Sequence, residues 1–396
     1  MTADFAALKL AVADALARFA AVDAALRAEV ETIAGMVADG VSPVPSVAWA
    51  DIAGGAVPPD LPDLVRRRGC VVVRGVFSPS QASAWDAELA AYLAENDADA
   101  VSRARRPGRW DNATPQMYSV YWSRPQVLAR QSEALAGVRA WLNRLWRFAG
   151  AFDPDAECTY ADRIRRRTPG DTSLALGPHI DGGTVGRWIG PASLPYRAVL
   201  AGDPAAFDPF DAAHRPEAVD PTDANACSMF RSFQGWTALT AQGPGDGTLQ
   251  VVPITRAIAW VLLRPFAADV PADSLCGAEA SKALWITPGW HAPLLRALVP
   301  IPRVEPGDSV WWHPDVIHAV EPAHTGRTPS NVMYIPAAPD CPRNRAFLPR
   351  QLAAFEAGTS PPDFPPDDLE TGFAGRAGPE LLNALGRRQM GQLLVT

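Results

Sequence analysis

The chain has 396 residues, of which 48% are hydrophobic and 20% charged, and its formal net charge is −7. A chain of this length can bury a sizeable core, as one large domain or two smaller ones, and its mild acidity argues against a nucleic-acid partner. No uncharged apolar run is long enough to span a membrane, and the 39 prolines and 30 glycines argue against a mostly helical fold.

The N-terminal region predicts a helical arm. Apolar residues recur every three or four positions from Phe5 to Val37, which is the spacing of one helical face, and Gly40 with the prolines after it ends the pattern. We expect residues 1–60 to form this arm and to pack on the core, with an interaction role as the alternative. The start of the chain lacks the features of a signal peptide and the five cysteines are scattered, so we expect a cytoplasmic protein with reduced thiols.

A strand that leads into a capped helix comes next. Residues 69–77 are a β-branched run typical of a buried strand. Ser78 and Gln81 then match a capping box, and Ser123 is placed to cap a second helical region near 124–149.

From about residue 156 onward, short β-prone runs alternate with turns rich in glycine and proline. Many short strands separated by turn signals favour a β-sandwich or barrel. We therefore predict a mainly β fold with flanking helices (α+β), whose core domain covers residues 61–345. Residues 346–396 are expected to form a C-terminal proline-rich segment and a final helix near 378–394.

The first candidate metal ligands are in the segment ALGPHIDGG. His179 and Asp181 stand two positions apart, so on an extended strand both side chains project from the same face. An imidazole and a carboxylate placed in this way supply two-thirds of the facial triad that suits nonhaem iron(II). The motif is short, and a polar loop leaving a strand is the alternative interpretation.

A third ligand is expected from the segment EPGDSVWWHPDVIHAV. His318 lies inside an apolar run on a predicted buried strand, where its ring nitrogens need partners. It is either a core histidine bonded to the backbone or, given the His-x-Asp pair, the third metal ligand. His313, beside a proline at a strand end, is expected to orient a ligand or to line the pocket.

Together these segments resemble the iron(II)/2-oxoglutarate-dependent dioxygenase superfamily. The His-x-Asp pair, a long intervening stretch and GDSVWWHPDVIH are similar to its phytanoyl-CoA-hydroxylase-like division, whose members often carry GD-x-x-x-x-H-x-x-x-x-H. The segments RGCVVVRGVFSPSQASAWDAEL and GTLQVVP resemble that division too, and the arm with DRIRRRTPGDTSLALGPHIDGG resembles a less characterised bacterial and fungal branch. The resemblance covers most of residues 65–340. It implies a double-stranded β-helix, a cupin-like jelly roll, with Fe(II) held at one mouth by His179, Asp181 and His318.

The resemblance also implies a site for 2-oxoglutarate, whose far carboxylate usually meets an arginine about ten residues after the distal histidine, often with a hydroxyl partner. Arg327 follows His318 by nine positions, and Ser330 begins the next predicted strand. The usual arginine position falls nearer Ser330, so an arginine from another strand is the alternative, and the candidates are Arg163, Arg165 and Arg231. Gly182 and Gly183 would turn the chain away from the iron and leave room for this cosubstrate.

Two groups of residues are candidates for binding a small-molecule substrate. The basic run RIRRR and Arg187 concentrate positive charge, which suits an anionic substrate group, unless they are surface residues paired with nearby acids. The other candidates are aromatic and amide side chains, although the chain's 13 tryptophans make core packing the competing interpretation. They are Tyr121, Trp122, Trp188 and Gln234.

The expected activity is that of an oxygenase that uses Fe(II), 2-oxoglutarate and O₂ to hydroxylate a small molecule, with release of succinate and CO₂. Two alternatives retain the same motifs. One is a zinc- or other metal-dependent cupin-like hydrolase or isomerase, and the other is a noncatalytic jelly-roll binding protein. The sequence leaves open the substrate, the choice between hydroxylation, desaturation and cyclisation, and the oligomeric state.

Overall fold

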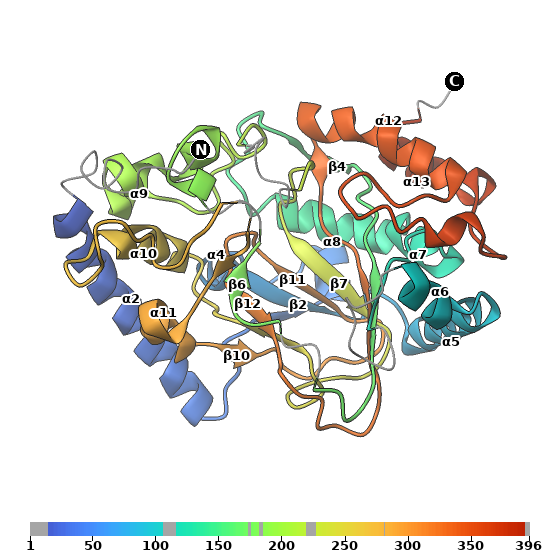
Figure 1. Cartoon of the computed structure of the whole chain (residues 1–396), viewed down its shortest axis with the longest axis horizontal. Helices are drawn as coiled ribbons and strands as arrows, with labels where there is room; N and C mark the ends of the chain where they lie inside the picture. The colour runs from blue at the N-terminus through green and yellow to red at the C-terminus, as the bar shows by residue number, and fades with distance from the viewer. Residues whose placement is uncertain are drawn as a thin grey trace.

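Two β-sheets occupy the centre of the molecule, with helices on both sides of them (Figure 1). The computed structural model describes residues 15–105, 116–172, 176–181, 185–218, 227–280 and 282–392. In these ranges helical residues outnumber strand residues, so the fold is mixed α and β, with more helix than the expected mainly β fold. Of the helices described, none combines the length and the apolar character needed to cross a membrane.

The larger sheet has seven strands in the order β1-β2-β11-β7-β13-β5-β3, all antiparallel to their neighbours except in the β1–β2 pair. Its strands are β1 (Ser46–Ala48), β2 (Cys70–Arg74), β3 (Met117–Tyr118), β5 (Ile164–Arg167), β7 (Gln234–Ala238), β11 (Ser309–Trp312) and β13 (Ser330–Tyr334).

The smaller sheet has five antiparallel strands in the order β10-β8-β12-β6-β9. They are β6 (His179–Ile180), β8 (Leu249–Val251), β9 (Leu284–Trp285), β10 (Val299–Pro300) and β12 (His318–Val320). A separate pair joins β4 (Asp153–Glu157) to β14 (Pro339–Asp340).

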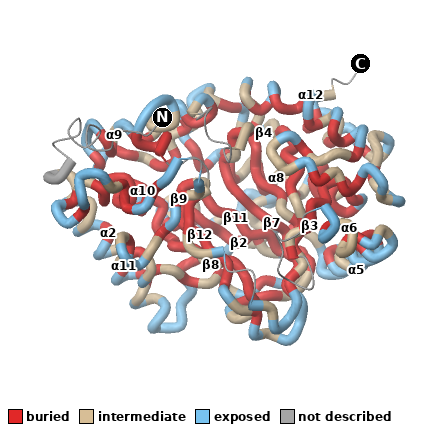
Figure 2. The backbone as a smooth tube through the Cα atoms, viewed as in Figure 1, coloured by how far each residue is buried: buried red, intermediate tan, exposed pale blue. Residues whose placement is uncertain are grey.

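The main apolar cluster joins the inner faces of the two sheets. Because alternate residues of a strand point to opposite faces, each inner strand contributes every second side chain. Trp236, Val310 and Val332 of the larger sheet belong to one buried cluster with Leu249 and Val251 of the smaller sheet. Figure 2 shows the same strands as a continuous buried centre under an exposed outer layer. The sheets thus enclose an interior whose polar side chains must find partners within it.

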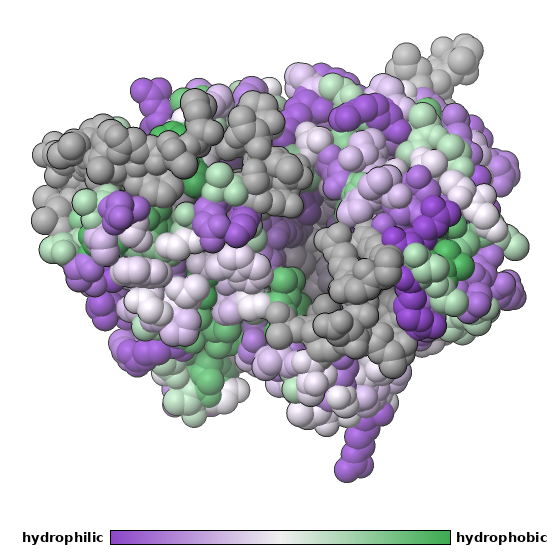
Figure 3. Space-filling model, viewed as in Figure 1, coloured by the Kyte–Doolittle hydropathy of each residue, from purple (hydrophilic) through white to green (hydrophobic). Residues whose placement is uncertain are grey.

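The helices lie on two sides of this centre. On one side are α2 (Ala15–Ala38), α9 (Arg197–Ala201), α10 (Ala257–Leu263) and α11 (Pro288–Leu295). On the other are α5 (Pro79–Glu95), α6 (Ala98–Arg105), α7 (Arg124–Arg130), α8 (Glu133–Asn143), α12 (Pro342–Ala357) and α13 (Ala384–Gln389). The short helices α3 (Trp49–Ala53) and α4 (Leu61–Arg68) flank β1 and β2 in the chain. The surface between the two helical sides is hollowed in the space-filling view (Figure 3).

Local capping signals set several helix boundaries. Ser78 Oγ accepts a hydrogen bond from Gln81 N (3.2 Å) and starts α5, and Ser123 starts α7 in the same way. The helical region expected near 124–149 is two helices, because Ser132 caps a new helix and accepts from Leu135 N (3.1 Å). The final helix is shorter than expected and consists of α13, while the first part of the predicted arm lies outside the described residues.

Candidate metal centre

Two neighbouring strands of the smaller sheet bring two histidines next to each other. His179 is the first residue of β6 and His318 the first residue of β12, and the antiparallel pairing sets the two directly opposite each other. Their ring centroids are 4.3 Å apart. Asp181 directly follows β6 and projects to the same side as His179, as the two-residue spacing predicted.

The three side chains converge on one point. His179 Nε2 is 3.2 Å from Asp181 Oδ1, and His318 Nε2 is 3.8 Å from Asp181 Oδ2. One ligand atom from each residue lies within 4.8 Å of the other two, and in the described part of the chain no other His, Cys, Asp or Glu side chains form such a group. The two histidine side chains are 4% and 7% exposed, whereas that of Asp181 is 37% exposed, so the group opens to solvent on the carboxylate side.

Backbone hydrogen bonds orient both rings. His179 Nδ1 lies 2.8 Å from Gly177 O, and His318 Nδ1 lies 3.0 Å from Val316 O. A ring that donates from Nδ1 to a carbonyl keeps its Nε2 lone pair for a metal ion. Both Nε2 atoms face Asp181, so the two imidazoles and the carboxylate form the donor set that nonhaem iron(II) sites use.

The electrostatics of the group suit a cation. Burial lowers the pKa of His318 to about 4, so this ring is neutral at pH 7. For His179, burial lowers the pKa, but the hydrogen bond to Asp181 and its charge outweigh burial and raise the pKa above its usual value. Burial raises the pKa of Asp181, yet the hydrogen bond from His179 and the charge of His318 leave it well below its usual range. Asp181 is therefore a permanent carboxylate that needs a positive partner.

Arg187 contacts the backbone of Asp181 in the candidate metal centre. It follows Asp181 in a short 3-10 turn (Val185–Arg187), is buried, and donates from Nη2 to Asp181 O at 2.6 Å. This contact fixes the backbone of a ligand residue, which differs from the substrate contact that the sequence indicated. Gly182 and Gly183, the expected turn, lie outside the described residues.

His313 lies next to the turn that precedes His318 and is not itself one of the three candidate ligands. Its Nε2 lies 3.0 Å from Pro209 O, its Nδ1 accepts from Asp315 N at 3.0 Å, and its ring stacks on Trp146. Burial lowers its pKa to about 3, so the ring is neutral. Val316 N donates to His313 O, and Val316 O is the acceptor for His318. His313 thus shapes the turn that presents a ligand and touches none of the three ligand side chains.

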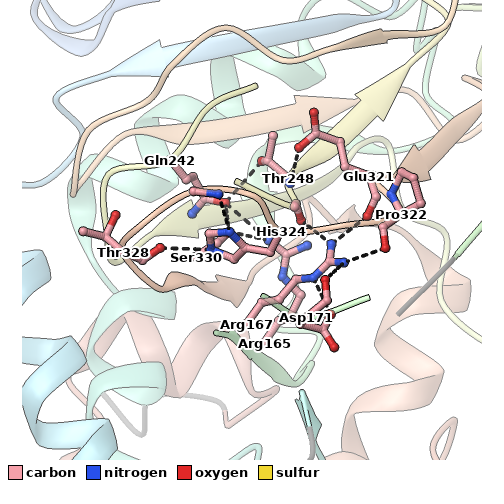
Figure 4. A network of polar contacts seen from close by, with 12 residues as sticks. Arg165, Arg167, Asp171, Gln242, Thr248, Glu321, Pro322, His324, Thr328 and Ser330 are labelled. Carbon is pink, nitrogen blue, oxygen red and sulfur yellow. Dashed lines mark hydrogen bonds and ion pairs between the residues drawn. The ribbon is translucent and has the colours of Figure 1, made fainter. Parts of the chain in front are cut away.

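A buried arginine and a serine meet on the inner face of the larger sheet (Figure 4). Arg165 on β5 donates from Nη2 to Ser330 Oγ of β13 (3.1 Å) and to Gln242 Oε1 (3.3 Å). Ser330 Oγ and Thr248 Oγ1 donate to the same Gln242 oxygen, at 2.6 and 3.2 Å. Arg165 Nε has no partner among the described residues, and burial lowers the pKa of this guanidinium. The cation therefore meets only neutral side-chain acceptors.

The other cosubstrate candidates lie elsewhere. Arg327 is exposed in the turn before β13 and is not brought to Ser330. Arg163, one residue before β5, lies with its guanidinium 5.1 Å from the centre of the Phe364 ring. Arg231, three residues before β7, lies 5.6 Å from the centre of the Tyr160 ring.

The predicted pocket residues are all buried but separate into different clusters. Trp122 donates from Nε1 to Thr359 O (2.7 Å) inside a C-terminal apolar cluster, and Trp188 donates to Leu262 O (2.9 Å) inside the main core. Both tryptophans are therefore packing residues. Tyr121 contacts the ring of Phe364, whose centre is 5.0 Å away. Gln234 opens β7 opposite Trp312, and its Nε2 has no partner among the described residues.

Several residues of the site were not predicted from the sequence. Gln242 and Thr248 lie in a turn-rich stretch. Gln242 contacts both Arg165 of β5 and Ser330 of the paired strand β13, and Thr248 donates to Gln242. Phe364 comes from the C-terminal proline-rich segment, for which the sequence indicated no role in the site. Trp312 was expected only as a strand residue, yet its ring centre is 5.4 Å from that of His318. No local pattern marks these residues, since their partners are distant in the chain.

The fold and the triad define a protein of mixed α and β structure with two antiparallel sheets and a candidate His–Asp–His metal centre. The chain belongs to the Gig2-like family, whose model matches residues 1–392. It is 45% identical over 375 residues to the uncharacterised protein YbiU of Escherichia coli K12, covering 91% of this chain and 88% of that protein.

Two solved structures are similar over almost the whole chain. One is from Salmonella typhimurium LT2, a protein to which an oxidoreductase role is ascribed, with a TM-score of 0.91, 42% identity and coverage of 99% of this chain and 98% of that one. The other is GlcNAc Inducible Gene 2, GIG2 (DUF1479), from Candida albicans, with a TM-score of 0.81, 26% identity and coverage of 98% and 89%.

Proposed function

We propose that this protein is an iron(II)- and 2-oxoglutarate-dependent oxygenase built on a double-stranded β-helix. The observation that carries the proposal is the convergence of His179, Asp181 and His318, with both Nε2 atoms facing the carboxylate. Two imidazoles and one carboxylate occupy one face of an octahedral ion and leave the opposite face for other ligands.

The sheet arrangement supports the same class of fold. A jelly roll places two antiparallel sheets around a shared interior, and here one apolar cluster joins the inner faces of both sheets. The metal centre lies at one end of this interior, where β11 ends at Trp312 and β12 begins at His318. The interior beyond it is the place where a cosubstrate would extend from the metal.

Arg165 is the residue that we assign to the far carboxylate of 2-oxoglutarate. A buried guanidinium with only neutral side-chain partners and an unsatisfied Nε lacks an anion, and burying such a charge without one is costly. A carboxylate would supply both the missing acceptors and the missing charge, through hydrogen bonds stronger than those between neutral groups. Ser330 is the hydroxyl partner beside it.

The roles of this chain's residues follow from their positions. His179, Asp181 and His318 would hold the ion, while Arg165 and Ser330 would orient the cosubstrate. Bound iron(II), with 2-oxoglutarate and O₂, supplies the oxidant that hydroxylates a substrate C–H bond with release of succinate and CO₂. Apolar side chains of the inner faces would exclude water from the bound cosubstrate. The oxidoreductase role ascribed to the Salmonella relative agrees with this class of reaction.

The test uses the purified full chain loaded anaerobically with Fe(II). Binding of 2-oxoglutarate is followed by calorimetry and by visible charge-transfer absorption, and turnover by succinate formation and O₂ uptake. We expect 2-oxoglutarate to bind the iron-loaded protein and Arg165→Gln to weaken this binding at least tenfold. Arg327→Gln is the matched control, because Arg327 is an exposed arginine close to Ser330 in the chain, and it should leave the binding unchanged.

Two results would contradict the proposal. One is undiminished binding of 2-oxoglutarate to His318→Ala, which would show that this binding does not depend on the metal ion. The other is an iron-loaded protein that binds no 2-oxoglutarate. Activity supported by zinc without O₂ uptake would instead favour a hydrolase or isomerase on the same metal centre.

A further inference from the structure

Two arginines lie over a row of aromatic rings at the end of the interior that carries the metal centre. The guanidinium carbon of Arg231 is 5.6 Å from the centre of the Tyr160 ring, and that of Arg163 is 5.1 Å from the centre of the Phe364 ring. The two ring centres are 5.8 Å apart, and the centre of the Tyr121 ring is 5.0 Å from that of Phe364. We call these three rings the aromatic shelf.

Strand register places this pair beside the metal centre. Tyr334, at the end of β13, donates from its backbone N to Arg163 O (3.1 Å) and pairs with Trp236 of β7. Two residues before Trp236, the same strand opens at Gln234, which pairs with Trp312, the aromatic neighbour of His318. Arg163 and Arg231 therefore lie at the strand ends that frame the triad. The charge of Arg231 also contributes to the lowered pKa values of Asp181 and His318.

These two guanidinium groups make few hydrogen bonds with the described residues. Among the described residues, Arg231 takes part in no hydrogen bond and no ion pair, although it is only partly exposed. Arg163 has one distant contact, from Nε to Asp162 Oδ1 at 3.5 Å. Asp363, a carboxylate beside Tyr160, accepts from Tyr160 Oη (3.1 Å) and Ser228 N (2.8 Å). Within the described part of the chain, most N–H groups of both arginines therefore have no acceptor and could serve a ligand.

Structural arginines of this protein look different. Arg130 donates to Tyr121 O and Asp162 O, and Arg343 donates to three backbone carbonyls. Both side chains stabilise the chain by capping its carbonyl groups. The side chains of Arg163 and Arg231 cap no carbonyl of a described residue, so their stacking on the shelf holds two cations in place without consuming their donors.

We propose that Arg163 and Arg231 bind an anionic group of the substrate, a carboxylate or a phosphate, at the mouth of the metal centre. This inference rests on the proposed function, because a substrate is expected at this place only if the triad binds a catalytic metal ion. Arg165 lies two residues further along β5 and is assigned to the cosubstrate, which leaves the outer pair for a second anion. The guanidinium fork matches either oxyanion through paired hydrogen bonds, and the shelf limits the approach of the anion to one side.

The experiment measures binding of inorganic phosphate and of acetate to the full chain loaded anaerobically with Fe(II) and 2-oxoglutarate, by calorimetry. We expect at least one anion to bind in the millimolar range and Arg231→Gln to weaken its binding at least tenfold. The Arg163→Gln/Arg231→Gln double variant should abolish it, and Arg231→Lys should retain an intermediate affinity. Comparison of the affinities for the two anions identifies whether Arg163 and Arg231 prefer a phosphate or a carboxylate.

Arg350→Gln is the matched control. Arg350 also lies over a phenylalanine ring, with its guanidinium carbon 5.4 Å from the centre of Phe347, but it is exposed on α12. This variant should bind the anions as the native protein does. The urea unfolding midpoint of each variant establishes that it is folded.

The outcomes separate the two proposals. The proposal that Arg163 and Arg231 bind an anion is contradicted if the native protein binds neither anion. It is also contradicted if the double variant binds the anions as tightly as the native protein. Loss of 2-oxoglutarate binding in Arg231→Gln, with normal binding in Arg165→Gln, would show that Arg163 and Arg231 bind the cosubstrate. That result would also contradict the proposal of a substrate-anion site. If 2-oxoglutarate fails to bind but phosphate binding still depends on Arg231, the oxygenase proposal fails while the anion receptor stands.

Discussion

Arg165 and Arg167 point to the same face of β5, yet the protein satisfies only Arg167. Arg167 donates to Asp171 Oδ2 (2.8 Å) and to the backbone carbonyls of Gly247 (2.8 Å) and Glu321 (2.7 Å). Arg165 donates to Ser330 and Gln242, and its Nε is unpaired among the residues that the structure describes. The two arginines of this strand thus differ in their contacts (Figure 4): Arg167 is bonded to the fold by several groups, and Arg165 is the one that we propose binds the cosubstrate.

This contrast predicts opposite effects on stability. Arg167→Gln should lower the free energy of unfolding by about 3 kcal/mol, because it leaves Asp171 and the buried carbonyls without their donor. Arg165→Gln should leave the ligand-free protein within about 1 kcal/mol of the native value or stabilise it, because it removes a buried charge that lacks a counter-ion. Urea denaturation of the ligand-free variants measures both. A large loss of stability in Arg165→Gln would show that this side chain is structural.

Removal of a triad histidine should abolish metal binding without unfolding the chain. We expect His179→Ala and His318→Ala to lower the affinity for Fe(II) by roughly a hundredfold or more, since each removes one of three ligands. Metal content after equilibrium dialysis gives the affinity, and circular dichroism reports the fold. His214→Ala is the control, because His214 is exposed and lies outside the triad. Retention of iron by both triad variants would exclude these residues as ligands.

Arg187 should act as a positioning residue for Asp181. Arg187→Gln loses the charged donor to Asp181 O, so we expect a tenfold to hundredfold weaker metal affinity, which is the range for groups that orient ligands. Arg187→Lys should restore part of it. The visible spectrum of the Co(II)-loaded variant should shift as the carboxylate moves. An unchanged spectrum with reduced stability would assign Arg187 to packing alone, and the exposed Arg197→Gln serves as the matched control.

Glu370 should make the stability of the protein depend on pH. Its carboxylate accepts from the backbone N of Tyr121 and Trp122 and from Tyr92 Oη, and burial raises its pKa from the usual 4.5 to about 7. Between these two values the folded state holds a proton that the unfolded state has released. The contribution of Glu370 to stability is therefore lost as pH rises from about 4.5 to 7, by up to about 3 kcal/mol.

Glu370→Gln tests this dependence directly. Urea unfolding of the native chain and the variant across pH 4.5 to 8 should give a smaller fall of stability with pH for the variant, because the amide does not titrate there. Glu380→Gln changes an exposed residue in the same C-terminal region. This variant should show the same dependence of unfolding free energy on pH as the native chain. Identical slopes for Glu370→Gln and the native chain would show that Glu370 is ionised throughout this range.

Features that depend on residues close together in the chain could be read from the sequence. The spacing of His179 and Asp181 set their common face, and the serine caps of α5 and α7 are three-residue signals. His318 was predicted because a histidine inside an apolar strand requires a partner. Each of these depends on backbone geometry over a few residues, which local sequence determines.

Only the tertiary structure decided which distant side chains meet. Arg165 lies beside Ser330, 165 positions away, because β5 pairs with β13, while Arg327, which is nearer to Ser330 in the chain, is exposed. Phe364 belongs to the aromatic shelf although it comes from the C-terminal proline-rich segment, far from Tyr121 and Tyr160 in the chain. The physical reason is that such contacts arise from the register between strands and the return of the chain over itself. Both are stabilised by many weak contacts across the whole molecule rather than by a motif at either end.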